Sequence, residues 1–160
     1  MIKKNIIFFM VLFSLTSCTS PKIEKQESAF IVMKTAKMRY ADMGFISNSG
    51  SKVKVEIYAS GQPLVKFEIN GMNICMSTFE CMDKKDFNEK FLSSTYPNTL
   101  LENIFKAEPI FNRENLVEQE EGFRQKLTKD GLYDISYSVS GNQRVFRDKT
   151  NKILIKVREQ

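Results

Sequence analysis

The sequence of 160 residues contains no histidine and no tryptophan. Histidine is the commonest general base in enzymes and the commonest side-chain ligand of metal ions, so its absence removes the usual means of both functions. The sequence also shows no nucleophile placed beside a base in a recognisable pattern. We therefore expect a protein that is not an enzyme and that needs no cofactor and no metal ion.

The sequence also lacks a long hydrophobic run. Its main apolar stretch, residues 6–15, spans about ten residues, whereas a helix that crosses a bilayer needs roughly 20. Lys3 and Lys4 precede this stretch, and Leu15-Thr16-Ser17-Cys18 closes it. A positive start, a short apolar run and small residues before a cleavage site are typical of a signal peptide.

The end of this segment resembles the lipobox of bacterial lipoproteins. The resemblance implies that residues 1–17 are removed and that Cys18 becomes a lipidated N-terminus, held in a membrane by its acyl chains. The alternative is an ordinary secretory signal that is cleaved near residues 17–20. Thr19 stands where lipoproteins kept in the inner membrane have Asp. We therefore expect an outer-membrane anchor in a bacterial envelope, with the periplasmic face favoured over the cell surface.

The residues after the cysteine are polar and show no periodic apolar face, which predicts a flexible tether over residues 18–29. The remainder, residues 30–160, has the length of one domain. Removal of residues 1–17 leaves a small positive charge, and basic residues alternate with acidic ones along the sequence. We therefore expect no basic patch and no nucleic-acid partner.

Besides Cys18, the sequence has two cysteines, Cys75 and Cys81. Exported proteins fold in an oxidising compartment, so we expect these two thiols to form a disulfide. The alternative is a pair of free, buried thiols. Because the spacing is not Cys-x-x-Cys, a bridge that staples the fold is favoured over redox catalysis.

Alternating apolar and polar residues predict antiparallel strands in both halves of the domain, most clearly at Val53, Val55 and Ile57. A change of phase at Gly44 predicts a β-bulge, and Asn70-Gly71 predicts a hairpin turn. The expected strands cover residues 37–46, 53–58, 64–69 and 72–76, and then 122–128, 132–139, 143–147 and 152–157.

Between the two groups of strands, large apolar residues recur at helical spacing. We expect one helix over residues 83–95, with Asp83 as its N-cap, and another over residues 97–107, with Pro97 just inside its start. The order of elements predicts a mainly β fold with some α: a curved antiparallel sheet, or open β-barrel, covered on its concave side by about two helices.

This layout resembles the LolA/LolB group of periplasmic lipoprotein carriers and receptors, and the outer-membrane receptor is the closer match. The resemblance lies in residues 58–64, in residues 96–109 and in the paired strands 132–139 and 152–157. The chain departs from the family pattern at Val65, where a glycine is usual. It also lacks the family's tryptophans and has two additional cysteines.

The resemblance implies that the protein binds acyl chains and that an exposed Leu64 helps to transfer lipoproteins. The alternative for Leu64 is a place in the core, as is usual for apolar strand residues. An apolar cavity between sheet and helices would suit an acyl chain, and the alternative is a filled core. The residues expected to line this cavity are Phe45, Phe67, Phe91, Leu101, Ile104, Phe105 and Phe123.

The expected partners are therefore a membrane, acylated lipoproteins and the periplasmic carrier that delivers them. We expect a monomer that assists the localisation of other lipoproteins. The alternative function is that of a surface or periplasm-facing lipoprotein that acts as a protein-interaction module or antigen.

Overall fold

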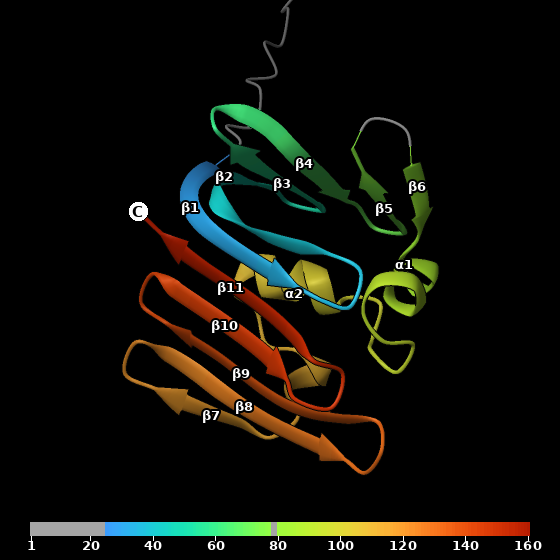
Figure 1. Ribbon diagram of the computed structural model, residues 1–160. Helices are drawn as coiled ribbons and strands as arrows, with labels where there is room; N and C mark the ends of the chain where they lie inside the picture. Colours follow the sequence, from blue (N-terminus) through green and yellow to red (C-terminus); the bar gives the residue numbers. More distant parts are fainter. Residues whose placement is uncertain (1–24, 78–79) are drawn as a thin grey trace, which may run out of the picture.

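A computed structural model describes residues 25–77 and 80–160 of the chain. The expected signal peptide, Cys18 and the first part of the expected tether lie outside the described residues. Eleven antiparallel strands of the described chain form one curved, unclosed sheet (Figure 1). The strands are β1 (Lys25–Lys34), β2 (Arg39–Ser49), β3 (Lys52–Ala59), β4 (Gln62–Ile69), β5 (Asn73–Met76), β6 (Glu80–Asp83), β7 (Leu116–Gln119), β8 (Gly122–Lys129), β9 (Tyr133–Ser140), β10 (Gln143–Asp148) and β11 (Ile153–Glu159).

The first strand lies in the middle of the sheet, whose strand order is β6-β5-β4-β3-β2-β1-β11-β10-β9-β8-β7. Strand β1 pairs with β2 on one side and with β11, the last strand, on the other. Its inward side chains Ala29, Ile31 and Met33 are fully buried. Strand β1 therefore joins two series of hairpins, β2–β6 on one side and β7–β11 on the other, into one sheet with one core.

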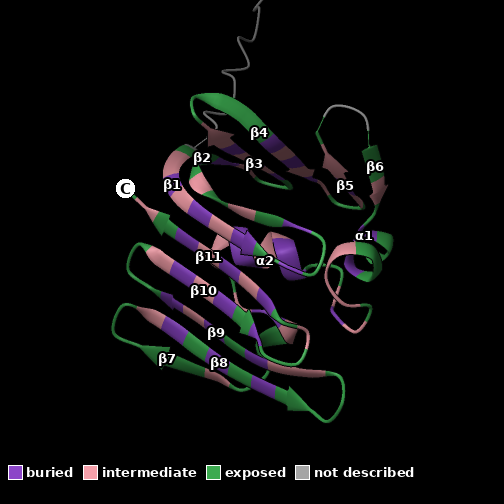
Figure 2. Ribbon diagram, in the orientation of Figure 1, coloured by how far each residue is buried: buried purple, intermediate pink, exposed green. Residues whose placement is uncertain are grey.

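Two short helices complete the fold. Helix α2 (Leu100–Lys106) lies in the concavity of the sheet, and α1 (Lys84–Phe91) lies beside β5 and β6 (Figure 1). A 3-10 turn, η1 (Phe111–Arg113), leads from α2 toward β7. Buried positions alternate along the strands (Figure 2), so one face of each strand packs inward. The expected mainly β fold with a curved antiparallel sheet and two helices is confirmed.

The tether prediction is wrong for residues 25–29, which form the start of β1. These residues pair in register with Asn48–Gly44 of β2, although most of them are polar. Backbone hydrogen bonds do not require apolar side chains, and Glu27 finds a partner in Arg144 at 3.2 Å. Because these residues are mostly polar, no alternation of apolar and polar residues indicates the beginning of β1.

Both helices are shorter than expected. Helix α1 begins directly after Asp83, the expected N-cap residue, whose side chain makes no capping hydrogen bond. Pro97 lies outside α2, because Leu100 is its first residue and the amide of Leu100 bonds to the Pro97 carbonyl at 3.0 Å. Helix α2 ends at Lys106, one residue before the expected end, and the left-handed Ala107 (φ 57°) caps it.

Gly44 has a different role from the expected bulge. Strand β2 pairs continuously with β1 through this residue. A Cβ atom at Gly44 would lie 2.1 Å from the carbonyl oxygen of Glu56 on β3, so glycine permits a close approach of the two backbones. The register shift lies instead in the pairing of β3 with β4, where Leu64 has no partner between the pairs Ile57–Val65 and Tyr58–Pro63.

Candidate functional site

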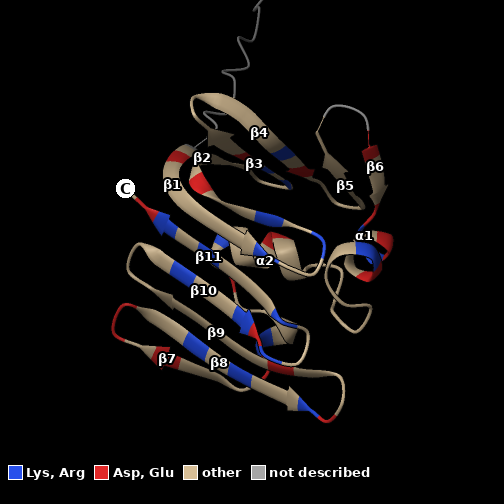
Figure 3. Cartoon of the chain, in the orientation of Figure 1, with Lys and Arg blue, Asp and Glu red and all other residues tan. Residues whose placement is uncertain are grey.

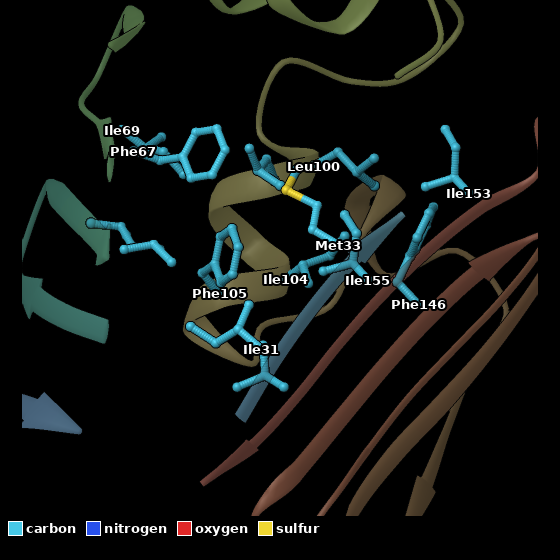
Figure 4. Close-up of a cluster of buried hydrophobic side chains, with 14 of the residues drawn as sticks. Ile31, Met33, Phe67, Ile69, Leu100, Ile104, Phe105, Phe146, Ile153 and Ile155 are labelled. Carbon is cyan, nitrogen blue, oxygen red and sulfur yellow. The ribbon is translucent and has the colours of Figure 1, made fainter. Parts of the chain in front are cut away.

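The concave face of the sheet and the two helices enclose one apolar layer (Figure 4). The inward side chains of α2 are Leu100, Leu101, Ile104 and Phe105, and each is at most 1% exposed. They pack in the same cluster as concave-face residues of both halves of the sheet. These sheet residues include Ile31, Met33, Phe67, Phe146, Ile153 and Ile155.

The structure brings together six of the seven residues expected at an acyl-binding site. Phe67, Leu101, Ile104, Phe105 and Phe123 belong to the buried cluster, and Phe91 packs against it. The side chains of this layer are almost completely buried, which agrees with the alternative of a filled core. Phe45 does not belong to it, because its side chain is 38% exposed on the convex face.

Leu64, the residue expected to help in lipoprotein transfer, lies apart from this layer. Its side chain is 51% exposed on β4, whereas its neighbour Val65 is buried. The structure therefore supports the exposed position and not the core alternative. A surface pocket of about 300 Å³ includes Leu64 in its lining, together with Pro63 and the charged residues Glu56 and Lys66.

Helix α2 is fastened to its neighbours by a small ionic network centred on Glu102. Its carboxylate accepts hydrogen bonds from Lys84 of α1 and from Lys106, both at 2.6 Å. Burial alone would raise the pKa of Glu102, but these two ammonium groups outweigh burial and lower it. Lys106 also donates to the carbonyl of Gly50 at 3.0 Å, which ties α2 to the β2–β3 turn.

At the other end of the layer, Arg144 connects β10 to the last turn of α2. Its guanidinium donates to the carbonyl oxygen of Phe105 and contacts the carboxylates of Glu27 and Glu159. Arg144 is only 6% exposed. Burial lowers the pKa of Arg144, while the charge of Glu27 acts in the opposite direction. This charged group was missed in the sequence because its partners are far apart along the chain.

A second buried polar pair holds the segment that leads into α2. The Tyr96 hydroxyl donates to Asp148 at 2.5 Å, and Asp148 also accepts from the backbone amides of Asp134, Thr150 and Asn151. Burial would raise the pKa of Asp148, but these hydrogen bonds lower it overall. Desolvation and the neighbouring carboxylate raise the pKa of Tyr96.

Two further buried polar side chains lie on the concave face. Gln125 bonds with both its amide nitrogen and its oxygen to the backbone of Ile110, at 2.9 and 2.8 Å. Its neighbour Tyr137 is fully buried, and its hydroxyl has no hydrogen-bond partner among the described residues. Burial raises the pKa of Tyr137. Its hydroxyl is a polar group that a bound molecule could use.

The two cysteines expected to pair do form a disulfide. Cys75 on β5 and Cys81 on β6 are direct cross-strand partners at the edge of the sheet. The bridge therefore staples the short hairpin of β5 and β6. Strand β6 itself was not expected from the sequence.

No protein-family model matches the chain, and a search of curated proteins finds no match. Within the described residues, no helix is long and apolar enough to cross a membrane. The same part of the chain holds no group of three or more His, Cys, Asp or Glu residues that could bind a metal ion.

Proposed function

We propose that this protein is a lipoprotein, anchored to the outer membrane through Cys18, that binds acyl chains and assists the localisation of other lipoproteins. An acyl chain would enter between α2 and the concave face of the sheet. The protein would receive acylated lipoproteins from a periplasmic carrier and release them to the membrane, without a cofactor.

The observation that carries this proposal is a short helix lying over an apolar concave face. Helix α2 has seven residues, and isolated helices shorter than about 12–15 residues are marginal in water. Its position therefore depends on the apolar layer and on a few polar contacts at its ends. Displacement of α2 would uncover two apolar surfaces, which is the lining that an acyl ligand requires.

The exposed position of Leu64 supports the same proposal. A large apolar side chain held at the surface gains no stability from burial. It can therefore contact an acyl chain or a lipid surface at no cost to the core. The uncovered side chain and the covered concave face would act at successive steps of the transfer.

The proposal is tested with the chain from residue 18 carrying Cys18→Ser, which keeps every described element. We expect this protein to bind a fluorescent fatty acid, and we expect hydrogen exchange in residues 100–106 to rise on binding. In cells, Leu64→Glu in the lipidated protein should impair lipoprotein localisation. Met72→Glu, at a surface position that is 76% exposed, is the matched control. Absence of fatty-acid binding together with normal localisation in the Leu64→Glu strain would refute the proposal.

A second candidate function is that of a protein-interaction module. The unclosed sheet leaves β6 and β7 as edge strands, and exposed strand edges can pair with a strand of another protein. Co-purification with a protein partner, without extractable lipid, would favour this function over acyl binding.

A further inference from the structure

The convex face of the sheet gathers basic side chains that are dispersed along the sequence. In β11, Ile153, Ile155 and Val157 are buried, so Lys156 and Arg158 between and after them point to the convex face. The same alternation of buried and exposed residues places cations from four more strands on this face. Figure 3 shows where basic residues lie along the strands. The set, named here the basic face, is Lys34, Arg39, Arg124, Lys126, Arg147, Lys156 and Arg158.

The expectation of no basic patch is therefore wrong for this face. Alternation of charges along the sequence does not predict their distribution in a sheet, because strand geometry and register select every second residue. The strand β9, which lies between β8 and β10, contributes Ser136 and Ser138 to the face beside Lys126 and Arg124. Small hydroxyl side chains thus separate two groups of cations.

The charges of the basic face are not neutralised within the described part of the protein. None of its seven side chains forms an ion pair with a described residue. Across β8–β11, the acidic residue on this face is Asp134, which pairs with Lys149 at 3.7 Å. The face therefore presents a positive potential that an anionic partner would complement.

Two hollows on this surface are lined by the same cations. Four cations, Lys34, Arg147, Lys149 and Lys152, line a pocket of about 490 Å³ whose lining also includes the acidic Asp148. Arg124 and Lys126, together with Ser136, line a second pocket of about 370 Å³. Groups the size of a phosphate can therefore approach several cations at once.

An exposed apolar patch adjoins the basic face. Phe30 on β1 pairs with Arg158 on one side and with Met43 on the other. Met43 is 41% exposed, and Phe45, which is 38% exposed, stacks edge-on against Tyr58 at 5.8 Å. The convex surface is thus amphipathic, with a cationic part directly beside an apolar one.

We propose that this convex surface docks on a membrane that contains anionic phospholipids. The basic face would contact lipid phosphates, while Met43 and Phe45 would enter the interfacial region. Surface binding to membranes combines these two contributions, apolar burial and attraction to anionic lipids. A nucleic acid would match the cations but would leave the adjoining apolar side chains without a partner.

The expected anchor places the same surface near a bilayer. The first described strand begins seven residues after Cys18, and that length spans at most about 25 Å. A lipidated Cys18 would thus keep the domain within reach of the lipid headgroups. This step rests on the proposed lipid anchor, but membrane docking does not require that acyl chains enter beneath α2.

Vesicle binding tests the electrostatic part of the proposal with the chain from residue 18 carrying Cys18→Ser. We expect binding to phosphatidylglycerol–phosphatidylethanolamine vesicles and much weaker binding to phosphatidylcholine vesicles. The double variant Lys156→Gln/Arg158→Gln should bind about 25-fold more weakly, at about fivefold for each cation. The control Lys85→Gln/Lys90→Gln removes the same charge from α1 and should bind normally.

A single tryptophan tests the apolar part, because the natural sequence has none. In Phe45→Trp, anionic vesicles should shift the emission to shorter wavelength, and brominated lipids should quench it. Met72→Trp places the probe at an exposed turn outside the proposed surface and should show neither effect.

Equal binding to neutral and anionic vesicles, or equal loss in the α1 control, would overturn the proposal. Binding to heparin or DNA without binding to vesicles would overturn it too, and would assign the basic face to a different polyanion. Fatty-acid binding by the Lys156→Gln/Arg158→Gln variant is measured in parallel. Retention of that binding would separate membrane docking from acyl uptake, and a failure of either proposal would be seen without the other.

Discussion

The hydroxyl of Tyr96 donates a 2.5 Å hydrogen bond to the carboxylate of Asp148, 52 residues further along the chain. Tyr96 precedes α2, and Asp148 ends β10, so this bond ties the covering segment to the C-terminal half of the sheet. Both side chains are at most 5% exposed. The bond therefore fixes where the segment before α2 enters the core.

Removal of this hydroxyl should weaken the fold. We expect Tyr96→Phe to lower the free energy of unfolding by about 1–3 kcal/mol, because Asp148 loses one buried donor while the ring remains. Urea unfolding followed by circular dichroism measures the change. Tyr133→Phe, at a ring that packs on Phe111, is the matched control and should change stability by less. Equal losses in the two variants would contradict a special role for the Tyr96 bond.

The same carboxylate predicts a pH dependence of stability. The folded state lowers the pKa of Asp148, so its contribution is present above the unfolded value near 3.9 and is lost as pH falls through the folded pKa. We expect Asp148→Asn to be less stable than the natural protein at pH 7, with the difference shrinking below about pH 4. Urea unfolding at a series of pH values tests this. A difference that is constant across the series would refute the assignment.

Loss of Arg144 should be more costly than loss of Tyr96. Arg144→Met takes the buried guanidinium away from the carboxylates of Glu27 and Glu159 and frees the Phe105 carbonyl. Breaking a buried ion pair in this way costs about 3–5 kcal/mol. Hydrogen exchange should show the largest increase in α2. Arg147→Met removes the same charge from the exposed end of β10 and should change unfolding little.

Loss of the disulfide should destabilise the edge hairpin of β5 and β6 and leave the rest of the sheet unchanged. Cys75→Ser/Cys81→Ser opens a loop of six residues, for which the loss of chain constraint amounts to about 2 kcal/mol. We expect faster hydrogen exchange in β5 and β6 and unchanged protection in β8–β11. A global loss of protection would mean that the edge hairpin is needed for the whole sheet to form.

Removal of the Tyr137 hydroxyl should not weaken the fold, in contrast to removal of the Tyr96 hydroxyl. Tyr137→Phe removes a buried polar atom that has no hydrogen-bond partner among the described residues, so stability should stay equal or rise. If this hydroxyl receives the polar end of an acyl ligand, the variant should bind a fluorescent fatty acid more weakly. Unchanged affinity would remove Tyr137 from the acyl-binding site.

Strands with one buried and one solvent-exposed face could be predicted from the sequence, because their apolar and polar residues alternate. Strands without this alternation could not. Val53, Val55 and Ile57 alternate with polar residues, and they form β3 as expected. The middle of β1, by contrast, is continuously apolar, because its inward residues enter the core while Phe30 and Val32 join the convex surface. No period of two is visible in such a strand.

The polar contacts that hold α2 could not be predicted for a different reason. Arg144 and Glu27 are 117 residues apart, and only the pairing of β1 with β11 brings their strands into one neighbourhood. The expected acyl-site residues were easier, because large apolar side chains at helical and strand spacing pack together in most folds. Leu64 was left open in the sequence because large apolar strand residues usually pack in the core, although Val65, Phe67 and Ile69 alternate with polar residues and indicate the inward face of β4.

The central place of β1 also has a consequence for the order of folding. Each series of hairpins can form from contacts that are close in sequence, but β1 is completed only when β11, the last strand, pairs with it. Such non-local pairing is slow, because a long chain loop must close before the contacts form. Strand β1 therefore acquires its second neighbour only after residues 153–159 of β11 have been synthesised.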